Sequence, residues 1–409
     1  MKINHLNERD KRIYELEKFT LMQYNFDHTA EDPSIPGRGI ELENAHELLR
    51  IRYIIQYLTR HDYEPPFYKG YKHYRPEVQA TVHGQWLLAL LVKLTQPEEN
   101  LWLAKHHYDA SPDISKLLEI CKAAINNQPS YVDGVGLIRP LPIDPSDYWY
   151  TERRQVDAIV ASFAELSQTI RKALLNRELK ARVKSFKRNA KERQKQAQSI
   201  TEQAWNTHSS VLLLRLDWGF RKDYYSAQYS TMSQPEFEAT FAKVCRYRKQ
   251  MVKSLKKMFG KDLAFYIWKI ECGERKGLHI HWLIGLNGSK HQQNVTVGKQ
   301  IQECWDAEIN DNETYTFNVN GMRGAQESGL RVIDYHDPDL WEIVDRYVDY
   351  LLKVDYTIKL RIPAGMRSFG CSQPKKTPKK KTGPKRKFNL ISTGSRSTLR
   401  FNRFQKNTI

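Results

Sequence analysis

A pair of histidines separated by one apolar residue offers the clearest chemistry in this chain. His279 and His281 flank Ile280 inside an apolar run. If this run is a β-strand, alternate side chains point to opposite faces, so the two imidazoles lie side by side while Ile280 points the other way. Two such imidazoles can bind one metal ion. A chain with 13 histidines also produces such a triplet by chance, and it then fits two half-buried surface histidines.

A carboxylate is expected beside the two imidazoles. Residues 263–272 form a second apolar run, and a short turn, residues 273–277, joins it to the histidine run. In a hairpin centred on Arg275, Glu271 lies directly across from His279 and shares a face with both histidines, while Cys272 faces away. Two imidazoles and a carboxylate with open positions suit Mn²⁺ or Mg²⁺ held for phosphate chemistry. A structural zinc site would need a fourth ligand, usually a thiolate.

A tyrosine-bearing helix is predicted over residues 339–353, with Asp337 or Asp339 as its N-cap. Projected at 100° per residue, its apolar residues form one broad arc. Tyr347 lies well inside this arc, which favours a core tyrosine. Tyr350 lies at the edge of the arc. This position suits a nucleophile whose ring is anchored and whose hydroxyl is accessible, and it also fits an ordinary boundary tyrosine.

The region around these residues alternates strands and helices. We predict strands at 210–218, 263–272, 278–286, 315–320 and 330–334, and helices at 234–259, 294–309 and 339–353. Ser233 and Glu236 form a capping box at the start of the first helix, and Gly260 ends it. The β-α-β-β-α-β order predicts an α+β domain of the ferredoxin-like type, an antiparallel sheet with helices on one face.

The order and spacing of these motifs resemble those of a known family. The strand at 210–218, the set of Glu271, His279 and His281, and residues 350–353 resemble the three ordered motifs of HUH endonucleases, the rolling-circle replication initiators. Residues 329–335 and 366–370 resemble segments of the inovirus gene-II-type replication proteins of filamentous phages and prophages. The resemblance covers about residues 208–372. The chain lacks a second tyrosine at the four-residue spacing of some two-tyrosine initiators. This absence favours a one-tyrosine cycle.

The resemblance implies a metal-dependent, site-specific endonuclease and strand transferase acting on single-stranded DNA. Tyr350 would attack a phosphodiester at an origin, giving a 5′-phosphotyrosyl link and a free 3′ hydroxyl, and so initiate rolling-circle replication of a filamentous-phage-like element. A phenol with an ordinary pKa near 10 is a poor nucleophile, so Mg²⁺ or Mn²⁺ on Glu271, His279 and His281 would polarise the phosphate. Lys353, one turn beyond Tyr350, would stabilise the phenolate or hold the adjoining phosphate. It also fits a solvated lysine at a helix end.

Charge is concentrated in two segments. Residues 374–409 contain twelve Lys or Arg and no acidic residue, and residues 171–195 contain eleven basic and two acidic residues. Together they carry more than the whole net charge of +18, so the remainder is slightly acidic. This distribution favours contact with a polyanion over general solubility. The candidate DNA contacts are Lys184, Lys187, Arg188, Lys379, Lys380 and Lys381, together with Arg215 and Arg367 from the segments that carry the resemblance. The expected partners are single-stranded or supercoiled origin DNA and a host polymerase and helicase.

The domain organisation follows from composition. Residues 1–150 predict a mainly helical accessory domain, with helices near 42–61, 76–94 and 112–125. Within it, residues 67–75 interleave aromatic and basic side chains and predict a loop that either packs on the surface or stacks on bases. Residues 151–207 predict a long basic connecting helix, 208–373 the HUH endonuclease domain, and 374–409 a disordered basic tail that also resembles a nuclear-import signal. The phage-like resemblance argues against nuclear import.

Two further observations concern location. The five cysteines form no Cys-x-x-Cys pair, which fits a reducing compartment. The first residues lack an apolar leader, and the longest apolar run, residues 86–92, is too short to span a bilayer. We therefore expect a protein of the bacterial host cytoplasm that does not enter a membrane. The oligomeric state is left open.

Two other functions remain open from sequence. The first is a non-catalytic, origin-binding regulator on a decayed version of the same fold. The second is a conjugative relaxase or single-tyrosine transposase, which uses the same chemistry on different DNA; the length of the chain and its helical N-terminal region count against a transposase. We find no phosphate-cradling glycine loop, so a fused helicase is not expected.

Overall fold

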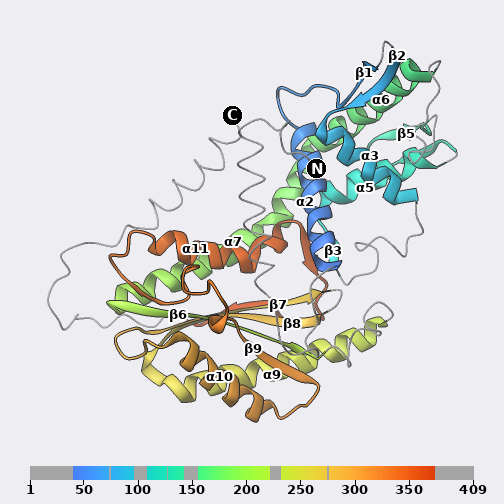
Figure 1. The fold of residues 1–409 in the computed structure, drawn as a ribbon. Helices are drawn as coiled ribbons and strands as arrows, with labels where there is room; N and C mark the ends of the chain where they lie inside the picture. Colours follow the sequence, from blue (N-terminus) through green and yellow to red (C-terminus); the bar gives the residue numbers. More distant parts are fainter. Residues whose placement is uncertain are drawn as a thin grey trace. The chain divides into compact units, whose positions relative to one another are not determined.

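The computed structural model describes residues 40–72, 75–95, 108–126, 128–141, 155–221, 232–273 and 276–373. The fold is mixed α+β with antiparallel sheets (Figure 1). The described residues divide into two compact units, the first built mainly from residues between 42 and 189 and the second mainly from residues between 190 and 354 and from 360 to 373. The predicted basic tail, including Lys379, Lys380 and Lys381, lies outside the described residues.

The first unit is mainly helical. Its helices are α2 (Ile40–Leu58), α3 (Val82–Thr95), α5 (Pro112–Ile125), α6 (Val156–Leu175) and the first part of α7 (Arg177–Thr207). Short antiparallel pairs accompany them: β1 (Phe67–Lys72) with β2 (Arg75–Ala80), and β4 (Ser130–Val132) with β5 (Gly136–Ile138). A late strand, β11 (Ile358–Leu360), pairs with β3 (Tyr108–Ala110).

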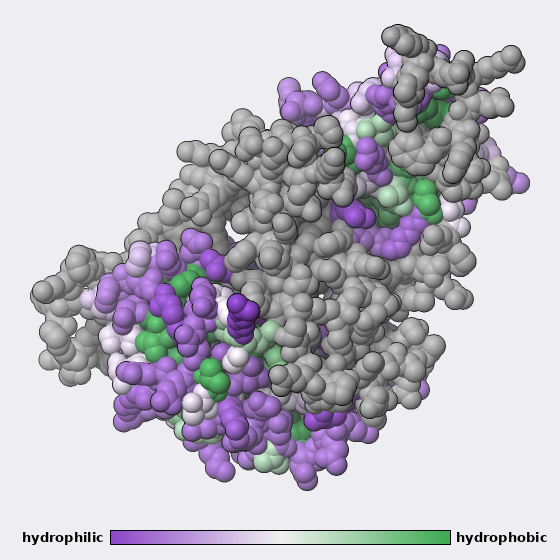
Figure 2. Space-filling view, in the orientation of Figure 1, coloured by the Kyte–Doolittle hydropathy of each residue, from purple (hydrophilic) through white to green (hydrophobic). Residues whose placement is uncertain are grey.

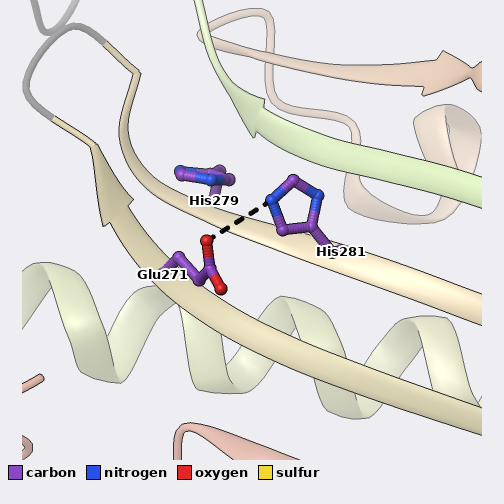
Figure 3. Close-up of side chains that lie close together, drawn as sticks. All are labelled: Glu271, His279 and His281. Atoms are coloured by element: carbon purple, nitrogen blue, oxygen red, sulfur yellow. Dashed lines mark ion pairs between the residues drawn. The ribbon is translucent and has the colours of Figure 1, made fainter. Parts of the chain in front are cut away.

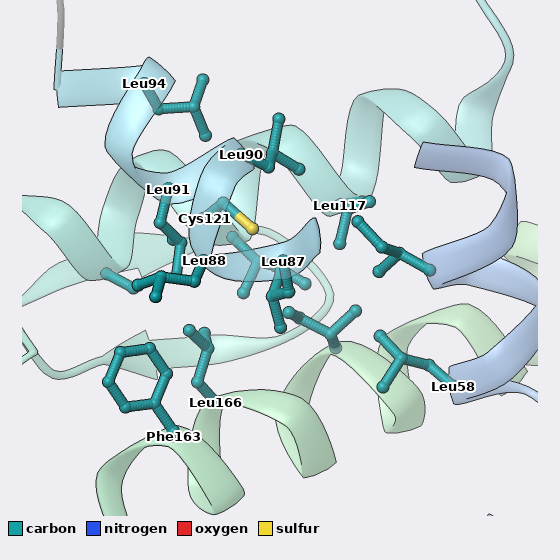
Figure 4. Close-up of a cluster of buried hydrophobic side chains, with 14 of the residues drawn as sticks. Leu58, Leu87, Leu88, Leu90, Leu91, Leu94, Leu117, Cys121, Phe163 and Leu166 are labelled. Atoms are coloured by element: carbon teal, nitrogen blue, oxygen red, sulfur yellow. The ribbon is translucent and has the colours of Figure 1, made fainter. Parts of the chain in front are cut away.

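Leucine side chains from several helices form the core of this unit (Figure 4). Leu87 and Leu91 of α3 meet Leu117 of α5, and all three are at most 1% exposed. Phe163 of α6 completes this core below the leucines. It contacts Phe67 of β1, and the two ring centroids are 4.3 Å apart. The mainly helical first unit therefore has a hydrophobic core of its own.

Three predictions for this unit were wrong in detail. Residues 67–72 form a strand of a hairpin rather than a loop, and Phe67 is buried against α6. The helix predicted near residues 76–94 begins only at Val82, because residues 75–80 form the second strand of this hairpin. The predicted long helix is two helices that break at Asn176. The side-chain oxygen of Asn176 accepts hydrogen bonds from the backbone N–H groups of Glu178 and Leu179, so this residue caps the start of α7.

The second unit contains a six-stranded antiparallel sheet. Its strands are β6 (Ser210–Phe220), β7 (Leu263–Gly273), β8 (Gly277–Asn287), β9 (Thr314–Asn318), β10 (Val332–Asp334) and β12 (Phe369–Cys371). The order across the sheet is β10-β6-β8-β7-β12, and β9 pairs with the same edge of β6 further along that strand. The long strands β6, β7 and β8 are therefore central.

Helices cover both faces of this sheet. On one face lie α9 (Gln234–Phe259) and α10 (Asn294–Ile309); on the other lie the second part of α7 and α11 (Leu340–Leu352) (Figure 1). Trp282 of β8 packs on Trp305 of α10, whereas Leu283 belongs to the core shared with α7 and α11. Successive residues thus point to opposite layers. The sequence predicts helices on one face only. The second face is covered as well, by α11 and by apolar residues of α7: Ala197, Ile200, Ala204 and Trp205.

The local signals of the second unit are confirmed. Helix α9 spans the predicted residues and begins with the predicted capping box, in which Glu236 accepts hydrogen bonds from the backbone N–H and hydroxyl of Ser233. It ends at Gly260, whose φ of 48° lies in the region that favours glycine. Helices α10 and α11 agree with the predicted ranges within one residue.

The surface has few large exposed apolar side chains. Among the described residues these are Tyr68, Tyr71, Tyr131, Leu137 and Val295. On the face drawn in Figure 2 the described residues are mostly hydrophilic, with hydrophobic side chains in scattered patches. Within the described part of the chain, no helix combines the length and the apolar character needed to cross a membrane.

Candidate metal and tyrosine site

The β7–β8 hairpin brings the three predicted metal ligands together. Glu271 pairs with His279 across the two strands, as expected from the turn, and His281 follows on the same face. One ligand atom from each of the three residues lies within 4.8 Å of those of the other two (Figure 3). All three side chains are buried, with exposed fractions of 9% or less. Among the described residues, this is a preformed set of donors that could hold a metal ion.

Hydrogen bonds orient both imidazoles toward a common point. The Nδ1–H of His279 donates to the carbonyl oxygen of Gly277 at 2.9 Å, because a carbonyl can only accept. Nδ1 of His281 lies 2.7 Å from Oδ1 of Asp217, which is likewise an acceptor. Each Nε2 is therefore left available as a ligand atom, and Nε2 of His281 lies 3.7 Å from Glu271. Carboxylate or carbonyl groups that hold ligating histidines in this way are typical of metal centres.

The charges around this set also fit a divalent cation. Burial alone would raise the pKa of Glu271, but hydrogen bonding and charge from His281 outweigh it and lower the pKa to about 2. For His281, burial lowers the pKa, whereas the charges and hydrogen bonds of Asp217 and Glu271 raise it to about 9. Without a metal, the two carboxylates thus hold a proton on this imidazole. A cation in the same place would satisfy the same carboxylates.

Tyr350 lies beside the three donors. Its ring centroid is 5.5 Å from that of His281. Tyr350 lies in the last turn of α11 and is 4% exposed. Its ring is buried, as predicted. The whole side chain is enclosed, however, whereas the sequence predicts an accessible hydroxyl. Tyr347, one turn earlier, is also buried, and its hydroxyl contacts that of Ser328 at 2.7 Å. The two tyrosines of this helix therefore have different partners, and Tyr350 is the one near the metal ligands.

Arg215 connects Tyr350 to the histidines. Its Nη2 donates to the Tyr350 hydroxyl oxygen at 3.0 Å and forms an ion pair with Asp217, also at 3.0 Å. The guanidinium also lies over the Tyr350 ring, 4.3 Å from its centroid. Arg215 is 5% exposed, so the structure places this predicted DNA contact inside the domain. A cation beside the phenol oxygen can stabilise the negative charge that develops there.

The remaining predicted residues are spread more widely. Lys353 begins a 3-10 helix, η7 (Lys353–Tyr356), and its side chain is outside the described part of the structure. Lys184 and Arg188 are exposed on α7, and Lys187 on the same helix is 3.7 Å from Asp113. Arg367 is exposed before β12. None of these three α7 residues belongs to the unit that contains the metal ligands.

Sequence reasoning missed Asp217. This residue is 4% exposed and contacts both His281 and Arg215. A signal was available: Arg215 and Asp217 are two residues apart in an otherwise apolar strand, and a strand places such residues on one face. Two opposite charges on one buried face indicate an internal network.

The comparisons with known proteins concern the same part of the chain. Residues 176–372 match the model of the YagK/YfjJ C-terminal domain. This match includes α7 and all the metal-site residues named above. The search of curated proteins found no match, and neither did the search of solved structures.

Proposed function

We propose that this protein is a metal-dependent DNA nicking enzyme that uses Tyr350 as its nucleophile. The proposal rests on one observation: the Tyr350 ring lies 5.5 Å from the ring of His281, which belongs to a buried set of three metal-ligand side chains. A tyrosine at a metal site need not be a nucleophile. Here, however, Arg215 also donates to its hydroxyl oxygen, the atom that would attack.

The strand order supports the resemblance to HUH endonucleases. In the order of the chain, β6, β7, β8 and β9 form a β-α-β-β-α-β unit, and in the sheet they run β9-β6-β8-β7. This order is consistent with the ferredoxin-like arrangement that the sequence predicts, and it supports the proposal. The YagK/YfjJ match covers this unit without naming an activity.

Glu271, His279 and His281 would hold the metal, Mg²⁺ or Mn²⁺. Their two imidazole nitrogens and one carboxylate leave coordination positions for a phosphate oxygen. When bound, the metal supplies Lewis-acid polarisation of the scissile phosphate and offsets charge on its oxygens. His281 is held in place by Asp217, and His279 by the Gly277 carbonyl.

In the proposed reaction, the Tyr350 oxygen forms a bond to phosphorus and the bond from phosphorus to the 3′ oxygen breaks. The phenol proton is lost and the leaving 3′ oxygen gains a proton, so a 5′-phosphotyrosyl link and a 3′ hydroxyl result. Arg215 stabilises the phenolate as it forms. Because Tyr350 is 4% exposed, entry of a DNA strand requires the C-terminal end of α11 to move.

In a biological setting, this chemistry fits initiation of rolling-circle replication of a filamentous-phage-like element, with origin DNA as substrate and a host polymerase extending the 3′ end. The test is to incubate the full chain with a supercoiled plasmid that carries the element's origin, in Mn²⁺ and in EDTA. We expect open circles only with Mn²⁺. Equal conversion in EDTA, or none in either, would contradict the proposal. A non-catalytic origin-binding protein would retard the plasmid without nicking it.

A further inference from the structure

A cavity lies at the β12 edge of the sheet in the second unit. Its volume is about 290 Å³, and its walls come from α7, α9, β7 and the segment around β12. Strand β7 contributes Trp268 to this cavity and Glu271 to the metal ligands. The two residues are three apart, so they lie about 10 Å apart along the strand and point to opposite faces. None of the three metal ligands lines the cavity, so the cavity is separate from the metal site.

Positive charge gathers around this cavity from different elements. Arg248 and Lys249 come from α9, and Arg367 comes from the segment before β12. Arg193 of α7 lies 5.8 Å from the ring centroid of Phe369, another lining residue. None of the described residues that line the cavity is Asp or Glu. Such a concentration of cations favours an anionic ligand.

Arg248 is held in place by an aromatic ring. Its guanidinium carbon lies 4.2 Å from the ring centroid of Trp268. Burial lowers the pKa of Arg248, and the positive charge of Arg367 lowers it further. The positively charged guanidinium groups of Arg248 and Arg367 therefore repel each other beside the cavity. A bound phosphate would offset this repulsion. Arginine suits phosphate because its planar group can donate two parallel hydrogen bonds.

The positive charge continues along α9. Residues 239–259 contain seven basic residues and no acidic one. Five of them fall within an arc of about 100° of the helix at 100° per residue, and all five are exposed: Arg246, Lys249, Lys253, Lys256 and Lys257. This basic stripe is about 16 Å long at 1.5 Å per residue, and Lys249 belongs to both the stripe and the cavity. A chain of phosphates could follow the stripe, whereas a free nucleotide would use only the cavity.

We propose that the cavity and the α9 stripe form a binding site for single-stranded DNA, in which Arg248 and Arg367 bind one backbone phosphate. The cavity has room for the attached sugar or base beside the aromatic wall of Tyr266, Trp268 and Phe369. In a duplex the bases are paired and cannot enter, so the site selects a single strand. The inference deepens the proposed function and rests on it for the biological role of the strand.

The test measures binding of a fluorescent dT oligonucleotide of roughly 16 nucleotides by anisotropy, over a range of salt concentrations. The test protein carries Arg248→Gln and Arg367→Gln. The matched control carries Lys290→Gln and Lys299→Gln, which remove the same charge from two lysines paired with Asp262 and Glu303. Arg367→Gln alone is the second variant, because Arg367 is exposed and its loss should leave the fold intact.

We expect the Arg248/Arg367 double variant to bind at least about tenfold more weakly than the control, because it loses hydrogen bonds to a charged phosphate. The slope of log affinity against log salt should become shallower by about 0.7, the value for one phosphate on a single strand. Arg367→Gln alone should show part of both effects. Affinity equal to that of the control, an equal loss for duplex DNA, or no binding by the unmodified protein would overturn the proposal.

Failure of the proposed DNA-binding site can be distinguished from failure of the nicking proposal. The Arg248/Arg367 double variant should bind Mn²⁺ as the unmodified protein does, because none of the metal ligands lines the cavity. Tyr350→Phe should bind the oligonucleotide normally while forming no covalent product. If only the covalent product fails to form in the unmodified protein, the nicking proposal fails and the binding site stands.

Discussion

Nδ1 of His281 lies 2.7 Å from Oδ1 of Asp217, and both side chains are almost completely buried. This contact turns the Nε2 atom of His281 toward Glu271, the other carboxylate near the ring. Asp217 also forms an ion pair with Arg215, which in turn donates to Tyr350. One carboxylate therefore positions a metal ligand and, through Arg215, the proposed nucleophile.

Replacing Asp217 should weaken metal binding without removing a ligand. Above about pH 9, where His281 is already deprotonated, we expect Asp217→Asn to lower Mn²⁺ affinity by about 10- to 100-fold, since groups that orient ligating histidines contribute effects of this size. At neutral pH the lower pKa of the imidazole offsets part of this loss. The amide can keep a contact with His281 but loses the charge that raises the pKa of the imidazole. Isothermal titration with Mn²⁺ at several pH values measures both effects. A purely structural role for Asp217 would leave the pH dependence of binding unchanged.

Metal binding should strengthen as pH rises. The pKa of His281 is raised to about 9, so this imidazole is protonated at neutral pH and must lose a proton before it can bind a metal. The pKa of Glu271 is lowered to about 2, so this carboxylate is already charged. Mn²⁺ affinity should therefore rise about tenfold per pH unit between roughly pH 6.5 and 9. Titrations in buffers of different ionisation enthalpy would report the released proton, and an affinity independent of pH would contradict this assignment.

Removing either histidine ligand should abolish Mn²⁺ binding and nicking. We expect this for His279→Ala and for His281→Ala, while salt-sensitive DNA binding is retained because other residues contact the phosphates. His291→Ala is the matched control: this histidine lies 3.9 Å from Asp262, outside the metal set. Unchanged nicking in either ligand variant, with circular dichroism showing a folded protein, would refute the metal assignment.

Arg215 offers a test of how the phenol is activated. Arg215→Lys keeps the charge but cannot keep both the Asp217 ion pair and the Tyr350 hydrogen bond in the same geometry. We expect the nicking rate to fall by about 10²-fold, in the range found when a donor to a developing oxyanion is removed, with little change in DNA affinity. A loss of affinity with an unchanged rate of nicking would instead assign Arg215 to DNA binding.

Much of the second unit could be predicted from sequence because its signals are local. The β7–β8 turn fixes the register that places Glu271 opposite His279, and the capping box and Gly260 fix the ends of α9. These depend on neighbouring residues alone. The boundaries of the short strands differ from the predicted ones by up to two residues, because β9 and β10 share an edge of β6 and their extent depends on that partner.

The remaining features depend on contacts between distant residues. Asp217 and His281 are 64 residues apart, and Arg215 and Tyr350 are 135 apart, so no local pattern joins them. The burial of Tyr350 follows from the packing of α11 on the sheet, which the helical projection indicated only as an edge position. The basic stripe on α9 was visible in the sequence, but its relation to the β12 cavity was not.

The most direct test of the central claim is mass spectrometry of the protein after reaction with a single-stranded origin oligonucleotide and Mn²⁺. We predict a peptide that contains Tyr350 and carries a 5′-linked nucleotide. Tyr350→Phe should form no such adduct, whereas Tyr347→Phe should still form it. An adduct on any other residue, or strand cleavage by Tyr350→Phe at an undiminished rate, would contradict the assignment of Tyr350 as the nucleophile.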